Sequence, residues 1–505
     1  MSSAKSSEHG WVGAIDLGTT GVRFALFDHG GHCVASAYQP IPIDTPQPGW
    51  VEQNPDRMLA ATRAVVRQVL SEDTRFSHGL NAVGIANQRE TVIAWDRNTG
   101  RPLHPAIVWQ DRRTAARCDE LRNSEDAATL REKTGLSIDP YFSATKMEWL
   151  LDHVPGLRDR ATDGLALLGT VDAWLLWQLT GVHATDDTNA SRTMLYNVDR
   201  SGWDDDLLQL FGVPSACLPT IRPSLSTFGA IRPEFTTGTE VPVTAMLGDQ
   251  QAALLGQGLT AAGEAQVTWG TGAFLLMNTG RKRATSQAGL LTTVARTQAD
   301  AAACYALEGS VFVAGAAMQW LRDGLGLLGD VSEAEPLAES VDSTDGVVFV
   351  PALTGLGAPH WDAGARGLLI GLTRGTRREH LIRAGIESIA YQTHDVVRAM
   401  EADAGSGIPA LHVGGGAARN DFLCQFQSDL LGVPVVRPAD LETTARGAAY
   451  AAGVSSGFWE NLEAIRHLST EDRRFEPAMG SATRDRLLHQ WHRAIERAKG
   501  WEAES

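Results

Sequence analysis

The chain has 505 residues, enough for two to four domains at about 100–200 residues each. Hydrophobic residues make up 43% and charged residues 21%, a composition that excludes a wholly disordered chain. With 44 Lys and Arg against 60 Asp and Glu, the formal charge is −16, which argues against a dedicated nucleic-acid binder. Five widely spaced cysteines without a Cys-x-x-Cys pair predict reduced thiols and a cytoplasmic location. No run of 18 apolar residues occurs, so we expect no membrane insertion.

Short apolar runs alternate with amphipathic stretches along the chain, which predicts an α/β fold. Residues 12–15 form an apolar run that ends in Asp16 and a Gly-Thr turn, and residues 23–27 form a second run. Two strands joined by so short a turn predict a hairpin. Next, Asn54 and Pro55 predict a capped helix start.

A second Gly-Thr turn follows the apolar run at residues 266–269. It resembles the first turn, which suggests a duplicated domain with a boundary near residues 253–265. At the end of the chain, apolar residues at helical spacing over 487–498 predict a closing helix. We therefore expect domains at 11–255 and 256–470 and a helical extension at 471–505.

The turn from Asp16 to Gly21 fits a phosphate and a metal. Glycine allows backbone N–H groups to converge on a phosphate, Thr19 and Thr20 add hydroxyls, and Arg23 adds a guanidinium. Asp16, at the strand end, can hold hydrated Mg²⁺. Taken alone, an ordinary hairpin turn explains this string equally well.

Three further strings place polar groups after apolar runs. Asp249 and Gln250 follow residues 243–247, at the mouth of a strand, where a carboxylate can accept a hydroxyl proton during phosphoryl transfer. Arg89 and Glu90 follow residues 83–86 and offer a donor and an acceptor to a polyol. Gly414, Gly415 and Gly416 allow backbone to lie against a planar group. Taken singly, the Asp249 string is also explained by a polar turn, the Arg89 string by a solvated ion pair and the glycine string by an ordinary loop.

Together, these strings resemble the glycerol kinases of the FGGY family of carbohydrate kinases, over roughly residues 11–470. The strings that carry the resemblance, in chain order, are residues 16–20, 87–91, 107–113, 139–146, 169–172, 188–194, 248–252, 269–272, 351–359 and 425–429.

The resemblance implies two actin-like, ribonuclease H-like domains flanking a nucleotide and substrate cleft. It implies an enzyme that transfers the γ-phosphate of Mg²⁺-bound ATP to glycerol, giving sn-glycerol 3-phosphate and ADP, and that is a homodimer or homotetramer. Asp249 matches the general base, and Asp16 and Asp249 match the metal-binding positions. The residues that match glycerol-binding positions are Arg89, Glu90, Trp109, Tyr141, Asp249, Gln250 and Phe274. Those that match phosphate and nucleotide positions are Thr19, Thr20, Gly21, Arg23, Thr271, Gly315, Gln319, Gly416 and Asn420.

Three positions depart from the family pattern. Leu17 stands where many relatives have Gln, Gly21 where Ser is common, and Gly414 where an acid usually precedes the paired glycines. At Gly21 one hydroxyl donor is lost, although the backbone N–H remains. None of the three removes the proposed general base.

Two rival functions remain open at this stage. The alternative most similar to glycerol kinase is a related kinase that acts on a larger sugar, although Arg89, Glu90 and three aromatic positions favour a small triol. The other is a nucleotide switch without transferase activity on the same fold. Against the switch stand Asp249 and the absence of an appended substrate-binding domain.

Overall fold

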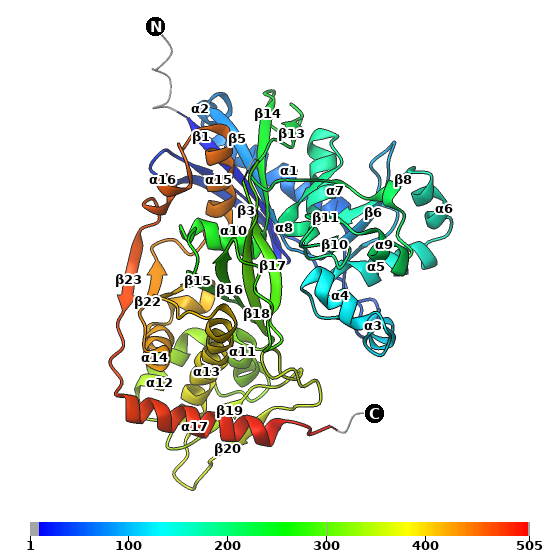
Figure 1. Cartoon of the computed structure of the whole chain (residues 1–505). Coiled ribbons are helices and arrows are strands. Elements are labelled where there is room, and N and C mark those ends of the chain that lie inside the picture. Colours follow the sequence, from blue (N-terminus) through cyan, green and yellow to red (C-terminus); the bar gives the residue numbers. More distant parts are fainter. Residues whose placement is uncertain (1–9, 300, 503–505) are drawn as a thin grey trace. The chain divides into compact units, whose positions relative to one another are not determined.

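The computed structural model describes residues 10–299 and 301–502, which form two compact units. Unit 1 contains residues 10–260, 292–305 and 443–469, and unit 2 contains residues 261–291, 306–442 and 470–502. Each unit is built on one main β-sheet with helices, so the predicted α/β class is confirmed. Figure 1 shows the elements coloured along the chain.

The main sheet of unit 1 has the strand order β13-β14-β5-β1-β2-β3. Strands β14, β5 and β1 are parallel, and the outer pairs are antiparallel. The bounds are β1 (Trp11–Leu17), β2 (Gly21–Phe27), β3 (Cys33–Pro40), β5 (Leu80–Asn87), β13 (Gly229–Ile231) and β14 (Val241–Gly248).

The predicted hairpin is confirmed, because β1 pairs antiparallel with β2 and places Asp16 opposite Arg23. The three parallel strands end level with one another: Leu17 of β1 and Gly248 of β14 both pair with Asn87 of β5. The residues that follow these strands therefore emerge at one edge of the sheet, where α/β proteins bind ligands.

Helices and small sheets complete unit 1. Helix α1 (Pro55–Glu72) begins as predicted, since the Asn54 side chain accepts a hydrogen bond from the Arg57 amide. The other helices are α2 (Thr74–His78), α3 (Ala115–Arg122), α4 (Ala127–Thr134), α5 (Ser143–His153), α6 (Leu157–Thr162), α7 (Val171–Thr180), α8 (Asp187–Ala190), α9 (Asp205–Leu210), η1 (Ser215–Cys217), α10 (Asp249–Gly256), α15 (Thr443–Ser456) and α16 (Leu462–Arg466). The minor strands are β4 (Glu52–Gln53), β6 (Val92–Asp96), β7 (Ala106–Ile107), β8 (Ala166–Thr170), β9 (Ala184–Asp186), β10 (Tyr196–Asn197), β11 (Gly202–Trp203) and β12 (Thr220–Arg222). Strand β17 (Leu291–Arg296) lies in the 292–305 segment of unit 1 except for its first residue.

Helix α15 comes after most of unit 2 in the sequence, but it packs within unit 1, beside α10 and the main sheet (Figure 1). Glycines permit this approach. A Cβ atom at Gly447 would lie 1.7 Å from the Ala252 carbonyl oxygen, and one at Gly84 would lie 2.0 Å from the Ala448 carbonyl oxygen. Backbone thus meets backbone where α15 crosses α10 and β5, and this contact holds α10, which begins at Asp249.

The main sheet of unit 2 contains the strand order β18-β16-β15-β21-β22-β23. As in unit 1, a hairpin (β15 and β16) is followed by two parallel neighbours and an antiparallel edge strand, which supports the predicted duplication. The strands are β15 (Ala265–Trp269), β16 (Ala273–Gly280), β18 (Cys304–Val311), β21 (Leu411–Gly414), β22 (Val435–Pro438) and β23 (Glu471–Phe475), with β19 (Val348–Val350) and β20 (Leu368–Ile370) apart. The helices are α11 (Gly315–Asp323), η2 (Val331–Glu333), α12 (Ala334–Glu339), α13 (Arg378–Ala404), η3 (Gly416–Arg419), α14 (Asp421–Leu431) and α17 (Ser481–Ala498).

The predicted closing helix is confirmed as α17, whose Trp491 and Ile495 are buried in the core of unit 2. None of the helices in the described part of the chain is both long and apolar enough to cross a membrane. All five cysteines are free, and Cys118, Cys217 and Cys424 are buried.

Candidate active site

Asp249 begins α10 directly after strand β14, so its carboxylate lies at the ligand-binding edge of the unit 1 sheet. Its Oδ1 atom accepts a hydrogen bond from the Gln250 amide at 2.7 Å and lies 3.2 Å from Arg89 Nε. The Arg89 side chain is only 2% exposed, whereas that of Asp249 is 28% exposed. A buried guanidinium therefore holds a carboxylate that ligands can reach.

Glu90 lies beside Arg89 in a constrained backbone conformation. Its φ of 64° is in the left-handed region, which is uncommon for a residue other than glycine. Ser143 Oγ donates to the Glu90 carbonyl oxygen at 3.1 Å, and Arg192 Nε donates to Glu90 Oε1 at 2.7 Å. Arg192 is fully buried. These contacts fix a buried carboxylate 3.9 Å from Arg89 Nε.

Gln250 offers an acceptor next to this group. Its side-chain oxygen is buried and has no hydrogen-bond partner among the residues that the structure describes. A buried polar atom without a partner is costly, and a ligand hydroxyl would satisfy it. Gln250 therefore fits the predicted polyol site.

Two predicted aromatic residues meet in unit 1. The rings of Trp109 and Tyr141 pack edge to face with centroids 5.5 Å apart, and Arg89 Nη2 donates to the Tyr141 hydroxyl at 3.4 Å. Trp109 Nε1 also donates to Thr19 Oγ1 at 2.9 Å. This bond connects the aromatic pair to the Gly-Thr turn. Phe274, the third predicted aromatic, lies on β16 in unit 2.

Lys146 stabilises the turn that presents Tyr141. Its fully buried ammonium donates to the carbonyl oxygens of Pro140, Tyr141 and Phe142 at 2.7, 2.7 and 2.8 Å. Burial lowers the pKa of Lys146 to about 8, although Glu90 and other acids act against the change. The three carbonyl acceptors explain why a lysine is tolerated there.

The predicted phosphate turn is fixed from behind. Gln53 Nε2 donates to the Thr19 carbonyl oxygen at 2.6 Å, and the Tyr38 hydroxyl donates to that of Thr20 at 3.1 Å. Tyr38 also explains the departure at Gly21. A Cβ atom there would lie 2.4 Å from the Tyr38 hydroxyl oxygen and 2.6 Å from the Gln39 carbonyl oxygen, so this chain has no room for serine at position 21.

Asp16 and Asp249 fit a magnesium site of the kind found with nucleotides. Mg²⁺ usually takes only one or two protein carboxylates and keeps waters and phosphate oxygens as its other ligands. Both residues lie at the same edge of the unit 1 sheet. Among the described residues, no cluster of three or more His, Cys, Asp or Glu side chains could form an all-protein metal site.

In unit 2, the predicted nucleotide residues gather at the corresponding sheet edge. The Thr271 carbonyl oxygen accepts hydrogen bonds from Ala314 and Ala316, so the Gly-Thr turn packs on the start of α11, which carries Gly315 and Gln319. The glycine string follows β21, the parallel neighbour of β15. A Cβ atom at Gly415 would lie 2.5 Å from the Trp269 carbonyl oxygen. The other two predicted residues lie in η3 and at the cap of α14, namely Gly416 and Asn420.

Four residues around the site received no role from the sequence. Arg192 and Lys146 contact Glu90 and the Tyr141 turn, and Gln251 Oε1 accepts from Arg89 Nη1 at 3.3 Å. The fourth, Thr188, accepts from the Gly248 amide. All four lie in strings that carried the family resemblance, and this was the signal available in the sequence. Their contacts span up to 162 residues of sequence, so no local pattern marks them.

Comparison with known proteins identifies the family. Residues 11–256 match the N-terminal domain of the FGGY family of carbohydrate kinases, and residues 265–456 match its C-terminal domain. The chain therefore belongs to the FGGY family of carbohydrate kinases. Its predicted resemblance to the glycerol kinases within this family is confirmed.

The chain is 49% identical to a glycerol kinase of Haloarcula marismortui over 506 residues, covering 98% of this chain and 99% of the relative. It is 50% identical to glycerol kinase 2 of Thermotoga maritima over 494 residues, covering 97% and 99%. Among solved structures, Plasmodium falciparum glycerol kinase with ADP matches with a TM-score of 0.92 at 34% identity, covering 98% and 99%. A gluconate kinase from Lactobacillus acidophilus, at 21% identity and a TM-score of 0.87, shares the fold.

Proposed function

We propose that this chain is an ATP:glycerol 3-phosphotransferase that produces sn-glycerol 3-phosphate and ADP. The observation that carries the proposal is the cluster in which Arg89 Nε lies between two carboxylates, 3.2 Å from Asp249 and 3.9 Å from Glu90. A triol presents hydroxyls that both donate and accept, which this mixed group can satisfy at short range. Near-full-length identity of 49–50% to curated glycerol kinases supports glycerol as the triol.

In the reaction, the Asp249 carboxylate accepts the proton of the attacking glycerol hydroxyl. That oxygen bonds to the γ-phosphorus, and the bond from the γ-phosphorus to the bridging oxygen breaks, leaving ADP. Arg89 donates to the glycerol hydroxyls, while Glu90 and Gln250 accept from them. Because these groups hold glycerol in a fixed position, the chemical step loses less entropy in bringing the reactants together. The glycerol carbons face the aromatic residues Trp109 and Tyr141 of unit 1, and Phe274 on β16 stays a predicted glycerol-binding residue.

We assign the phosphates of ATP to the two Gly-Thr turns, through Thr19, Thr20, Gly21, Arg23 and Thr271. We assign binding of the rest of the nucleotide to Gly315, Gln319, Gly416 and Asn420. Asp16 and Asp249 would hold Mg²⁺, which neutralises charge on the transferred phosphoryl group. The similarity to a glycerol kinase solved with ADP supports nucleotide binding.

An acceptor panel tests the proposal. ADP release is measured with glycerol, xylulose, gluconate and no acceptor, and we expect release with glycerol alone. Faster release with a sugar or sugar acid would favour the larger-substrate kinase. Release that needs no acceptor would favour the nucleotide switch.

A cytoplasmic location, a homodimeric or homotetrameric assembly and domains at 11–255, 256–470 and 471–505 stay predictions. The family resemblance supports the assembly, and gel filtration with light scattering checks it.

A further inference from the structure

A buried threonine on α8 contacts the backbone just before the proposed general base. Thr188 Oγ1 accepts a hydrogen bond from the Gly248 amide at 2.9 Å, and Gly248 immediately precedes Asp249. Thr188 is fully buried. The contact joins segments 60 residues apart in the sequence, at the turn where β14 passes into α10.

Asp186 determines which way this hydroxyl points. Asp186 Oδ2 accepts from Thr188 Oγ1 at 2.7 Å, from the Thr188 amide at 2.9 Å and from Ser224 Oγ at 2.7 Å. Because a hydroxyl has one proton, donation to Asp186 leaves only the lone pairs of Thr188 Oγ1 for the Gly248 amide. The carboxylate thus orients the acceptor on which Gly248 depends.

The same carboxylate reaches the end of the neighbouring strand through Asn189. Asp186 Oδ1 accepts from the Asn189 amide at 3.0 Å and from its Nδ2 at 2.8 Å. The Asn189 side chain exchanges two hydrogen bonds with Asn87, at 2.9 and 3.1 Å. Asn87 ends β5, two residues before Arg89. The buried Asp186 carboxylate is therefore connected by hydrogen bonds to the ends of both strands that precede the polar cluster, to β14 through Thr188 and to β5 through Asn189.

The backbone at Gly248 is closely packed and has little space for a different conformation. A Cβ atom on Gly248 would lie 2.5 Å from Arg89 Cδ, so the Arg89 side chain packs directly on this backbone. A rotated Gly248 amide would shift Asp249 against Arg89. Small displacements of a proton acceptor are costly, since a shift of about 1 Å can lower a rate about 100-fold.

We propose that Thr188, oriented by Asp186, is a positioning residue that fixes the Gly248 amide and thereby the Asp249 carboxylate. The proposal rests on the proposed role of Asp249 as general base. It gives a function to a string that the family resemblance marked but left unassigned. The competing explanation is that the hydroxyl only satisfies a buried amide and contributes to stability alone.

Thr188→Val tests the proposal, because it removes the hydroxyl and keeps the shape. Thr185→Val is the matched control: Thr185 is equally buried, and its hydroxyl donates to Asp172 at 2.6 Å and not toward Gly248. We measure kcat, the KM for glycerol and thermal unfolding for both variants. We expect Thr188→Val to lower kcat by about 10- to 100-fold with a nearly unchanged KM, Thr185→Val to keep kcat, and Thr188→Ser to restore it.

Unchanged kcat in Thr188→Val, or equal losses in both valine variants, would overturn the positioning role. If Thr188→Val does not fold, Thr188→Ala carries the same expectation. The double variant with Asp249→Asn adds a second readout: if Thr188 acts through Asp249, its substitution has no further effect on kcat there. Full turnover by Asp249→Asn alone would overturn the general base itself, whereas a normal Thr188→Val beside an inactive Asp249→Asn overturns only the positioning role.

Discussion

Arg89 Nε lies 3.2 Å from Asp249 Oδ1, which makes a buried cation the immediate neighbour of the proposed general base. The pair couples the glycerol-binding group to the proton acceptor. Removing each partner should therefore give a different kinetic signature.

Asp249→Asn should lower kcat by about 100-fold or more, because loss of a general base typically costs 10²–10⁴-fold. The amide is nearly isosteric with the carboxylate but cannot take up the hydroxyl proton. ATP binding, measured by calorimetry, should survive. Turnover close to wild type would remove Asp249 from the mechanism.

Arg89→Ala should act mainly on glycerol binding, since it deletes donors to the hydroxyls and keeps the Asp249 carboxylate as the proton acceptor. We expect the KM for glycerol to rise by at least about tenfold, the equivalent of one lost hydrogen bond to a charged group. Arg89→Lys keeps the charge without the planar fork and should give an intermediate KM. An unchanged KM in Arg89→Ala would mean that the arginine serves only stability.

Arg192→Met should be more damaging to stability than Arg89→Ala. Arg192 donates to Glu90 from a fully buried position, so its removal leaves a buried carboxylate short of its partner. Breaking a buried ion pair in this way costs about 3–5 kcal/mol. The free energy of unfolding in urea and the KM for glycerol should both worsen, since Glu90 loses its orientation. Loss of stability alone, with a normal KM, would place Glu90 outside the binding site.

Gly447→Ala should separate α15 from α10. The added methyl group would lie 1.7 Å from the Ala252 carbonyl oxygen, and helix backbones yield little. Overpacking of this kind costs about 1–3 kcal/mol. Gly375→Ala is the control, because its nearest neighbour is Thr373 Oγ1 at an ordinary 3.7 Å. Equal melting temperatures for the two variants would contradict the close approach.

Local features of the fold could be read from the sequence, and long-range contacts could not. The hairpin ending at Asp16 and the helix capped by Asn54 were predictable because spacing and turn chemistry decide them within a few residues. The packing of α15 in unit 1 was not, since nothing near residue 443 records a contact with Ala252. The strings around Arg89 and Asp249 indicated the chemistry, but the Arg192 contact with Glu90 spans 102 residues.

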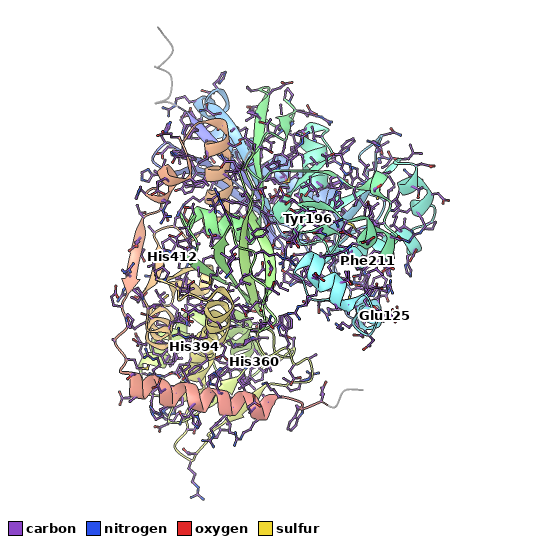
Figure 2. The ribbon with its side chains drawn as sticks, in the orientation of Figure 1. Glu125, Tyr196, Phe211, His360, His394 and His412 are labelled. Carbon is purple, nitrogen blue, oxygen red and sulfur yellow. The ribbon has the colours of Figure 1, made fainter. Side chains whose placement is uncertain are left out.

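The last prediction concerns a histidine cluster in unit 2, around Asp395 on α13. The buried carboxylate accepts from Trp491 Nε1 at 2.7 Å and contacts His360 and His492 at 3.0 Å and His394 at 3.3 Å. Figure 2 labels His360 and His394, close to α17. Burial favours a higher pKa for Asp395, but the hydrogen bonds outweigh it and hold the pKa well below its ordinary value. The hydrogen bond to Asp395 raises the pKa of His492 on α17.

These directions set the pH window in which α17 is held most firmly. The raised pKa of His492 contributes stability that is fully present below the unfolded value, about 6.5, and is lost as the pH rises through the folded value. The lowered pKa of Asp395 contributes stability above its unfolded value, which is lost as the pH falls. Thermal unfolding of the wild type should therefore shift to lower temperature between pH 6 and pH 8, and His492→Gln should reduce this shift. His489→Gln, an exposed change on the same helix, should leave it intact; the same pH response in His492→Gln as in wild type would rule His492 out as its source.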